Sequence, residues 1–210
     1  MTDQEKLFEE WAEKYESYVL NNQSTFPFLG YNDLVNDVVG LVCQNSTILD
    51  LGIGTGYITQ KIFSQKNSKI YGFDVSQKMI DIAKYRLRSA VIDKVDFNDY
   101  KNINWADYPN KFDCIIGTYF FHHYTDEVKI EMIRFLLSKL SENGKLIIGD
   151  IGFWNEDIFI ENKKSLGKQW DSDEYYFNIE KIGIELVKMN VQFNVKYISK
   201  CCILLTINNH

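Results

Sequence analysis

The 210-residue sequence lacks several patterns that would place it in particular classes of protein. It contains no run of 18 apolar residues, so no transmembrane helix is expected. Its first ten residues are polar and acidic, with no basic stretch followed by an apolar one, so no secretory signal is expected. The four cysteines include no Cys-x-x-Cys pair, and we interpret them as buried, reduced thiols of a cytoplasmic protein.

Basic residues are also fewer than acidic ones. The chain has 23 lysines and arginines against 29 aspartates and glutamates, which gives a formal net charge of −6. Because binding to phosphates is driven largely by lysine and arginine, we expect no broad contact with nucleic acid or with a membrane surface. The sequence contains no Gly-x-Ser-x-Gly elbow, so nothing in it supports a hydrolase.

Short apolar runs alternate with helical stretches from residue 47 onward. The predicted strands of this region lie at 47–51, 69–74, 91–97, 112–118 and 145–150. Such repetition is typical of a mostly parallel sheet with helices on both faces. Two further β-rich runs, at 191–199 and 201–208, are too close together for a crossover connection, so they are predicted to pair as an antiparallel hairpin.

The length predicts one α/β domain that spans residues 1–210. Two amphipathic patterns within 1–45 predict an N-terminal helical cap, because their apolar residues recur at helical spacing. The aromatic-rich segment 153–177 has mixed signals and is interpreted as a helical insertion.

A glycine-rich segment follows the first predicted strand. In Asp50-Leu-Gly-Ile-Gly-Thr-Gly56, glycines at alternate positions allow a sharp turn and let a ligand approach the backbone without meeting a Cβ atom. Asp74 ends the second predicted strand, where an acid can accept hydrogen bonds from two ribose hydroxyls. The pair predicts a nucleoside-binding site, and the alternative is a plain turn with a solvated Asp74.

The residues around these glycines narrow the choice of nucleoside. The dinucleotide pattern G-x-G-x-x-G requires its third glycine where this chain has Tyr57, because Gly56 comes one position early. Asp50, directly before the turn, suits a cationic ligand better than a pyrophosphate, because a carboxylate attracts an ammonium or a sulfonium. The sequence therefore favours a positively charged nucleoside over NAD.

The segment 48–56 resembles the glycine motif of class I S-adenosylmethionine-dependent methyltransferases. Later motifs of that family are matched, in the same order, at 71–79, 96–97, 112–116 and 140–147. The resemblance implies a Rossmann-like, seven-stranded, mostly parallel sheet with a C-terminal antiparallel hairpin and N-terminal helices. Within the family, the chain is similar to small bacterial methyltransferases of the YrrT type.

The resemblance implies that the cofactor is S-adenosyl-L-methionine and that the product is S-adenosyl-L-homocysteine. Asp50 would lie near the cofactor ammonium, Tyr15 would bond to its carboxylate, and Asp74 would hold both ribose hydroxyls. Asp96 would accept from the adenine amine, but the glycine usual before it is absent, so Asp99 is an alternative. The full set of expected cofactor-binding residues is Tyr15, Asp50, Gly52, Ile53, Gly54, Gly56, Asp74, Val75, Met79, Asp96, Phe97 and Thr118.

The candidate catalytic residues Tyr119, His122 and His123 follow the fourth predicted strand, where a methyl acceptor would arrive. An imidazole titrates near neutral pH, so either histidine could take a proton from the acceptor. The alternative is that the histidines bond locally and begin the next helix. No third histidine or cysteine lies at ligand spacing, so no metal site is expected.

These observations predict a methyltransferase that acts on a small molecule by in-line transfer. Alignment of the acceptor with an already activated methyl group can supply much of the barrier reduction. Two alternatives stay open, namely a protein that binds the cofactor without turnover and a methyltransferase that acts on protein or RNA.

Overall fold

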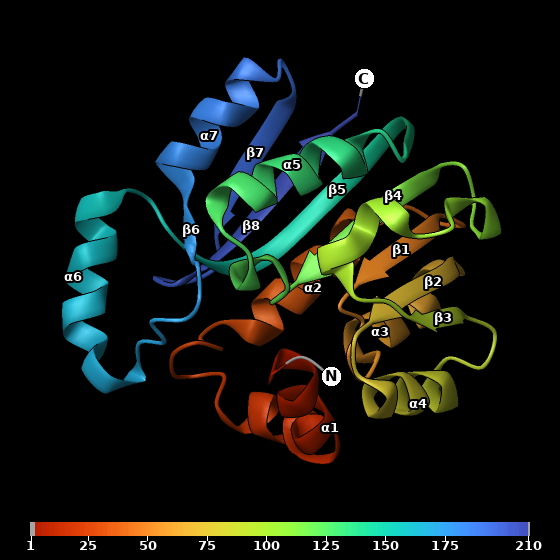
Figure 1. Ribbon diagram of the computed structural model, residues 1–210, viewed down its shortest axis with the longest axis horizontal. Helices are drawn as coiled ribbons and strands as arrows, with labels where there is room; N and C mark the ends of the chain where they lie inside the picture. Colours follow the sequence, from red (N-terminus) through yellow and green to blue (C-terminus); the bar gives the residue numbers. More distant parts are fainter. Residues whose placement is uncertain (1–2, 210) are drawn as a thin grey trace.

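A mostly parallel sheet forms the centre of the protein (Figure 1). The computed structural model describes residues 3–209. The seven strands of the main sheet are β1 (Thr47–Leu51), β2 (Lys69–Asp74), β3 (Val91–Lys94), β4 (Phe112–Thr118), β5 (Leu140–Phe153), β7 (Gln192–Tyr197) and β8 (Cys202–Asn208). Their order across the sheet is β3-β2-β1-β4-β5-β8-β7, and the first five strands along the chain pair in parallel.

The C-terminal strands pair as the sequence predicts. β7 and β8 form an antiparallel hairpin, and β8 also runs antiparallel to β5. A short additional strand, β6 (Phe177–Asn178), pairs with the end of β5. The predicted fold class, a Rossmann-like sheet with an antiparallel C-terminal hairpin, is therefore confirmed.

Several strand boundaries differ from the prediction, most clearly the end of β3 and the beginning of β5. β3 ends at Lys94 because the Asp96 carboxylate accepts a hydrogen bond from the Asn98 N–H (2.9 Å) and turns the chain into a 3-10 helix, Phe97–Asn102. β5 begins earlier than predicted, since Leu140 already pairs with Phe112 of β4.

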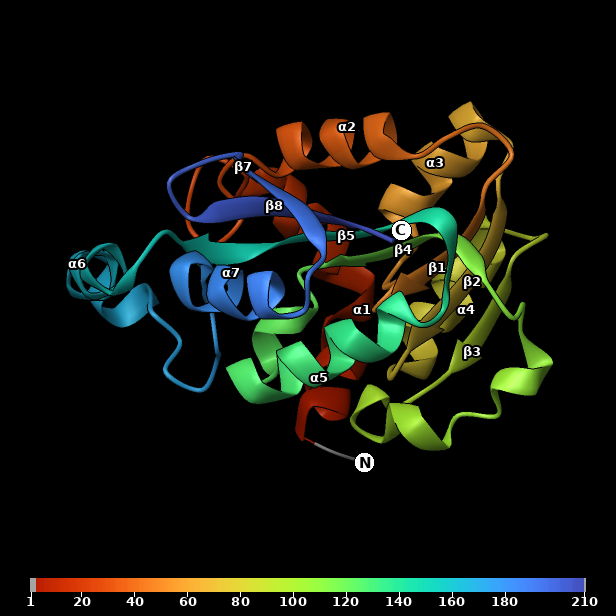
Figure 2. The ribbon, with the colours of Figure 1, turned by 90° about the horizontal axis from the view of Figure 1, so that it is seen from above.

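Helices cover both faces of the sheet (Figure 2). On one face lie α2 (Tyr31–Leu41), α3 (Tyr57–Lys66) and α4 (Gln77–Arg86), whose apolar residues form one core cluster with residues of β1 and β2. On the other face lie α5 (Asp126–Leu137) and α7 (Ile179–Lys188), which form a second core cluster. The sheet is therefore buried on both faces, as the uninterrupted apolar runs of its parallel strands require.

Several of these helices begin at a polar residue whose side chain accepts a backbone N–H. Ser76 accepts from Met79 at the start of α4 (3.3 Å), and Asn178 accepts from Lys181 at the start of α7 (3.2 Å). Such caps satisfy donors that the first turn of a helix leaves without a partner. These caps let α4 and α7 begin directly after the strands β2 and β6.

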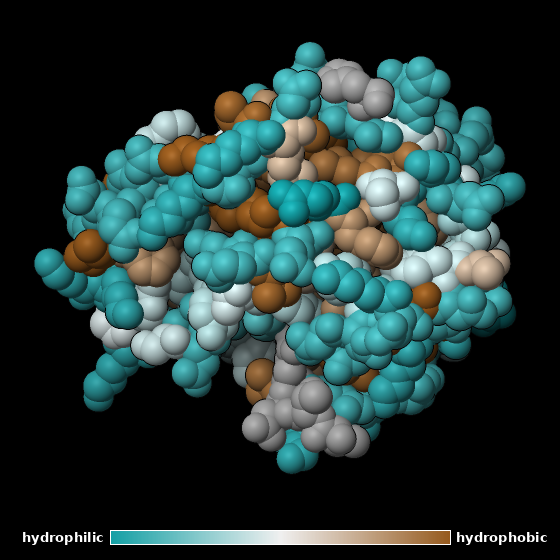
Figure 3. Space-filling model, turned by 45° about the horizontal axis from the view of Figure 1, so that its top comes forward, coloured by the Kyte–Doolittle hydropathy of each residue, from teal (hydrophilic) through white to brown (hydrophobic). Residues whose placement is uncertain are grey.

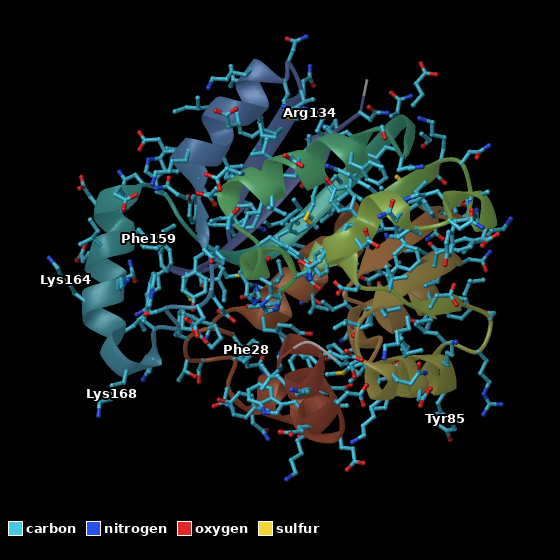
Figure 4. All side chains as sticks on the ribbon, in the orientation of Figure 1. Phe28, Tyr85, Arg134, Phe159, Lys164 and Lys168 are labelled. Atoms are coloured by element: carbon cyan, nitrogen blue, oxygen red, sulfur yellow. The ribbon has the colours of Figure 1, made fainter. Side chains whose placement is uncertain are left out.

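The segment 153–177 contains α6 (Glu156–Leu166), which lies at the edge of the molecule in Figure 1. Phe159 points from α6 toward the sheet, whereas Lys164 and Lys168 project outward (Figure 4). The Phe159 ring packs against Trp170, with 4.8 Å between ring centroids. This small aromatic cluster attaches the segment to the end of β5.

The surface in Figure 3 is covered mostly by hydrophilic residues, with small separate hydrophobic patches. Within residues 3–209, none of the helices combines the length and the apolar character needed to cross a bilayer.

The contact between α2 and β5 gives a test of the packing. A Cβ atom added at Gly149 would lie 2.6 Å from Leu34 Cδ1, and Leu34 is fully buried. We expect Gly149→Ala to lower the free energy of unfolding by about 1–3 kcal/mol because the added methyl overpacks the core. Urea denaturation followed by circular dichroism measures this change.

Gly40→Ala in α2 is the matched control, because a Cβ atom there meets nothing within 4 Å. This control should raise the free energy of unfolding by about 0.4–1 kcal/mol. Equal stability of the two variants would contradict the packing described here.

Candidate functional site

A cleft opens at the carboxyl ends of β1, β2, β3 and β4, and the loops that follow these strands form its floor. Ligands of open α/β sheets bind in this position. Every residue predicted to take part in the site lines this cleft except Gly56 and His122.

The glycine turn after β1 has the backbone conformation that the sequence suggested. Gly52, Gly54 and Gly56 all have positive φ angles, of 66°, 55° and 74°. A Cβ atom at Gly54 would meet only the Gly52 carbonyl oxygen, at 3.9 Å, so the space beside it is open. A Cβ atom at Gly56 would instead meet Leu87 at 3.2 Å, so Gly56 serves the packing against α4 rather than the cleft.

Asp74 connects the end of β2 to the glycine turn. Its Oδ2 accepts a hydrogen bond from the Gly54 N–H (2.8 Å), and its Oδ1 accepts one from the Ser76 N–H (2.9 Å). Burial raises the pKa of Asp74, while these backbone donors oppose the increase. Each carboxylate oxygen can accept a second hydrogen bond, so Asp74 can still bind hydroxyl groups of a ligand.

Asp50 is the most unusual group of the cleft. It is only 3% exposed, and its Oδ2 accepts a hydrogen bond from the Thr59 hydroxyl. Its Oδ1 is buried and has no hydrogen-bond partner within residues 3–209. Burial raises the pKa of Asp50 to about 7. A carboxylate oxygen of this kind, beside a cleft, is suited to a cationic ligand group.

Residues that follow β2 and β3 supply an apolar wall and one acid. Val75, Met79 and Phe97 line this part of the cleft, and Asp96 lies at its exposed edge. Asp99, the alternative to Asp96, does not line the cleft, and its carboxylate accepts from the Asn102 amide (2.6 Å).

The first helix, α1 (Asp3–Asn21), covers the cleft and is attached by carboxylates. Glu9 Oε1 accepts from the Ser76 hydroxyl (3.1 Å) and from the Lys78 N–H (3.2 Å), both at the start of α4. Glu16 Oε2 forms an ion pair with Arg86 (2.8 Å) near the end of α4. These contacts hold α1 along α4.

The same helix contributes aromatic side chains to the cleft. Phe8 and Tyr15, seven residues apart and therefore on one face of α1, both line it. Burial and the nearby Asp74 carboxylate raise the pKa of Tyr15, so its hydroxyl keeps its proton and can donate a hydrogen bond. The prediction included Tyr15 but missed Phe8, although the helical spacing of the two residues was a usable signal.

Tyr119 follows β4 in a left-handed conformation, with φ of 49°. Its hydroxyl donates to the Pro27 carbonyl oxygen (3.2 Å), and its ring packs against Phe28, 5.3 Å between centroids. Such a conformation costs a non-glycine residue about 1–3 kcal/mol and persists only where the surroundings fix it. Tyr119 is therefore held rigidly beside the cleft.

Asp150, which was not among the predicted site residues, organises the loop that carries the two histidines. This fully buried residue of β5 accepts through Oδ2 from the backbone N–H groups of Phe120 (3.2 Å), Phe121 (2.8 Å) and His122 (3.2 Å). Its Oδ1 lies 2.6 Å from His122 Nδ1. The sequence offers no local signal for this interaction, because Asp150 lies 28 residues beyond His122.

The fold gives the two adjacent histidines different surroundings. His122 is buried away from the cleft, and although burial lowers its pKa, the charges of Asp150 and Glu174 outweigh this effect and raise the pKa to about 10. His123 lines the cleft, and burial together with the charge of His122 lowers its pKa to about 3. Only His123 therefore offers a neutral imidazole to a ligand in the cleft.

Several aromatic residues of the cleft were not predicted as part of the site. They come from α2, from the start of α3, from β2 and from the loop after β4, and they are Tyr31, Tyr57, Phe73, Phe120 and Tyr124. In the sequence they resemble ordinary core residues, so only their convergence in the fold identifies them.

Comparison with known proteins gives consistent findings. A family model described as methyltransferase domain matches residues 43–200. An uncharacterized methyltransferase of Anoxybacillus flavithermus is 33% identical over 156 residues, which cover 73% of this chain and 69% of the relative. An uncharacterized methyltransferase of Bacillus cytotoxicus is 33% identical over 183 residues, which cover 82% of each chain.

A similar fold also occurs among solved structures. Magnesium protoporphyrin IX methyltransferase from Synechocystis PCC 6803, with bound S-adenosylhomocysteine, matches with a TM-score of 0.66. The match covers 98% of this chain and 99% of that chain at 16% identity, so it is a likeness of fold.

The raised pKa of Asp50 predicts a pH-dependent cost in stability. Between its unfolded pKa of 3.8 and its folded value of about 7, the folded state binds a proton that the unfolded state lacks, so stability falls as pH rises. We expect Asp50→Asn to equal the wild type near pH ~4 and to exceed it by about 3–4 kcal/mol at pH ~8. Urea denaturation across this range measures the difference.

Asp81→Asn, an exposed change of the same type in α4, should show no such trend. A constant difference between Asp50→Asn and the wild type at every pH would contradict the assigned burial of a titrating carboxyl.

Proposed function

This chain belongs to the class I S-adenosylmethionine-dependent methyltransferases, and we propose that it methylates a small molecule held in the cleft described above. S-adenosylmethionine, its cofactor, supplies a methyl group that its positively charged sulfur already activates. The assignment of the cleft to this cofactor depends mainly on one observation, namely that Asp50 Oδ1 is buried and has no hydrogen-bond partner among residues 3–209.

The residues at the methionine end fit the cationic part of the cofactor. A buried carboxylate oxygen without a donor is costly, and an ammonium group placed against it would supply the missing hydrogen bond. Asp50 and Thr59 would together fix this end, since the Thr59 hydroxyl already holds the other oxygen. The Tyr15 hydroxyl, which keeps its proton, would donate to the cofactor carboxylate.

The middle of the cleft fits a ribose. Asp74 would accept hydrogen bonds from both ribose hydroxyls, while its bonds to the turn keep its carboxylate in one orientation. The open space beside Gly54 would admit the cofactor against the backbone.

The adenine end is apolar with one acid at its edge. Val75 and Met79 would pack against one side of the purine, and Phe97 would contact it beside the loop after β3. Asp96, which lines the cleft where Asp99 does not, would accept from the adenine amine.

A small acceptor is supported by the enclosure of the cleft. α1 lies over it and is attached to α4 at two points, so a large substrate would have to displace this helix. The remaining lining is aromatic, including Tyr31, Tyr119 and Phe120, which suits a compact organic molecule. The net charge of −6 also disfavours nucleic acid.

The proposal gives the candidate catalytic residues different tasks. Tyr119 and His123 would contact the acceptor, because both line the cleft. His122 would position the loop instead of accepting a proton from the acceptor, because it does not line the cleft and its Nδ1 lies 2.6 Å from the Asp150 carboxylate. His123, with its low pKa, would accept a hydrogen bond from the acceptor and orient it.

Cofactor binding gives the first test of this proposal. Asp74→Asn should weaken the binding of S-adenosylhomocysteine by about 10-fold to 100-fold, because the amide keeps one acceptor oxygen and loses one charge-assisted hydrogen bond, which contributes about 1.5–3 kcal/mol. Isothermal titration calorimetry measures the affinity, and Asp81→Asn, the exposed control in α4, should bind like the wild type. Unchanged affinity of Asp74→Asn would remove this residue from the cofactor site.

The acceptor class gives the second test. The protein is incubated with methyl-labelled S-adenosylmethionine and an extract separated into metabolites, protein and RNA, and each fraction is analysed by mass spectrometry. We expect the label in a metabolite, because α1 restricts access to the cleft. Label in the protein or RNA fraction would overturn the small-molecule assignment, and cofactor binding without label in any fraction would indicate a protein that binds without turnover.

A further inference from the structure

Three potential metal ligands from distant parts of the chain converge beside the cleft. The ligand atoms of His122, His123 and Glu174 all lie within 4.8 Å of one another. The histidines follow β4, whereas Glu174 belongs to the segment between α6 and β6. Sequence spacing could not reveal this set, because its third member is far along the chain and is a glutamate.

The environment of His122 fixes which ring nitrogen faces Glu174. Nδ1 lies 2.6 Å from the Asp150 carboxylate, which can only accept, so the Nδ1–H group donates a hydrogen bond to that carboxylate. Nε2 then lies 3.5 Å from Glu174 Oε1. A ring nitrogen lone pair and a carboxylate oxygen repel each other at this distance unless a cation, either a proton or a metal ion, lies between them.

Glu174 is held in place by the residue that follows it. The Tyr175 N–H donates to the His122 carbonyl oxygen (2.7 Å), and the Tyr175 carbonyl oxygen accepts from the buried Lys129 ammonium. The Lys129 ammonium also pairs with Asp126 (3.0 Å). The backbone contacts of Tyr175 therefore place Glu174 beside the histidines, and the Tyr176 side chain also bonds to the Glu174 carboxylate.

We propose that His122 Nε2, His123 and Glu174 bind a divalent first-row transition-metal ion such as Zn²⁺. Two imidazoles and one carboxylate suit ions of this class better than Mg²⁺ or Ca²⁺, which prefer oxygen ligands. Tetrahedral coordination at Zn–N distances of 2.0–2.1 Å separates the ligand atoms by about 3.3–3.4 Å. The 3.5 Å between His122 Nε2 and Glu174 Oε1 is close to this separation, and all three ligand atoms lie within 4.8 Å of one another, so small side-chain rotations would complete the coordination.

Asp150 holds the His122 ring through the nitrogen that does not face Glu174. Metal-binding histidines commonly donate their other ring N–H to a carboxylate, which fixes the ring and strengthens the ligand. Asp150 is fully buried and occupies this position against His122. Asp150 would thus keep the His122 ring oriented for metal binding.

A metal ion at this place would adjoin the methyl acceptor. Three protein ligands leave at least one position of a tetrahedral ion open. Because His123 lines the cleft, an oxygen or sulfur atom of the acceptor could fill that position and be held there. This consequence rests on the proposed function, whereas metal binding itself does not.

The experiment titrates the full chain, after treatment with a chelator and dialysis, with Co²⁺. Tetrahedral Co²⁺ absorbs visible light, so absorption spectroscopy reports its coordination without any measurement of activity. We expect one Co²⁺ per chain, displaced by Zn²⁺, and we expect Glu174→Gln and His123→Ala each to weaken the affinity more than about 100-fold. Asp173→Asn, an exposed loss of the same charge one residue away, is the matched control and should bind like the wild type.

Two results would overturn the metal site. Absence of Co²⁺ and Zn²⁺ binding by the wild-type chain would mean that a proton alone lies between His122 and Glu174. Equal affinity in Glu174→Gln and the wild type would mean that the metal binds elsewhere. Circular dichroism checks that each variant folds, and calorimetry of the same samples with S-adenosylhomocysteine tests cofactor binding separately, so failure of one proposal leaves the other distinguishable.

Discussion

The buried carboxylate of Asp50 is the constraint on which the cleft depends. Asp50 lies at the end of a central strand, and one of its oxygens has no donor in the described part of the chain, so its ionised form lowers the stability of the folded protein. Such a cost is typical of a binding site, where a group that destabilises the empty protein is complementary to a ligand. The glycine turn beside it leaves the backbone open to that ligand.

Two other carboxylates shape the loops around this constraint in the same way. Asp74 accepts backbone N–H groups of the glycine turn and of the start of α4. Asp150 accepts three successive N–H groups of the loop after β4. In both places a carboxylate on a strand accepts backbone N–H groups that have no partner in a helix or sheet. These hydrogen bonds fix the conformations of irregular loops. The loops on both sides of the cleft are thus held by buried carboxylates of neighbouring strands.

The sequence predicts the sheet and the cleft residues after β1 and β2 better than it predicts the contacts of the loop after β4. Parallel strands buried on both faces appear as apolar runs, and strand-end residues such as Asp50 and Asp74 meet at one edge of the sheet because the strands are parallel. The end of β3 was wrong because a single side chain, Asp96, turns the chain there. Asp150 and Glu174 were missed because their contacts with His122 join distant segments, which no local pattern encodes. The likeness to methyltransferases of the YrrT type stays a prediction.

The attachment of α1 has a consequence for how the protein exchanges its ligands. Glu9 and Glu16 hold this helix to α4 through polar contacts, and one of them is a partly exposed ion pair with Arg86. Dissolved ions screen attractions of this kind, whereas they leave apolar packing intact or strengthen it. We therefore expect a higher salt concentration to loosen the attachment of α1 to α4. The product would then leave the cleft faster, while the core of the protein stays folded.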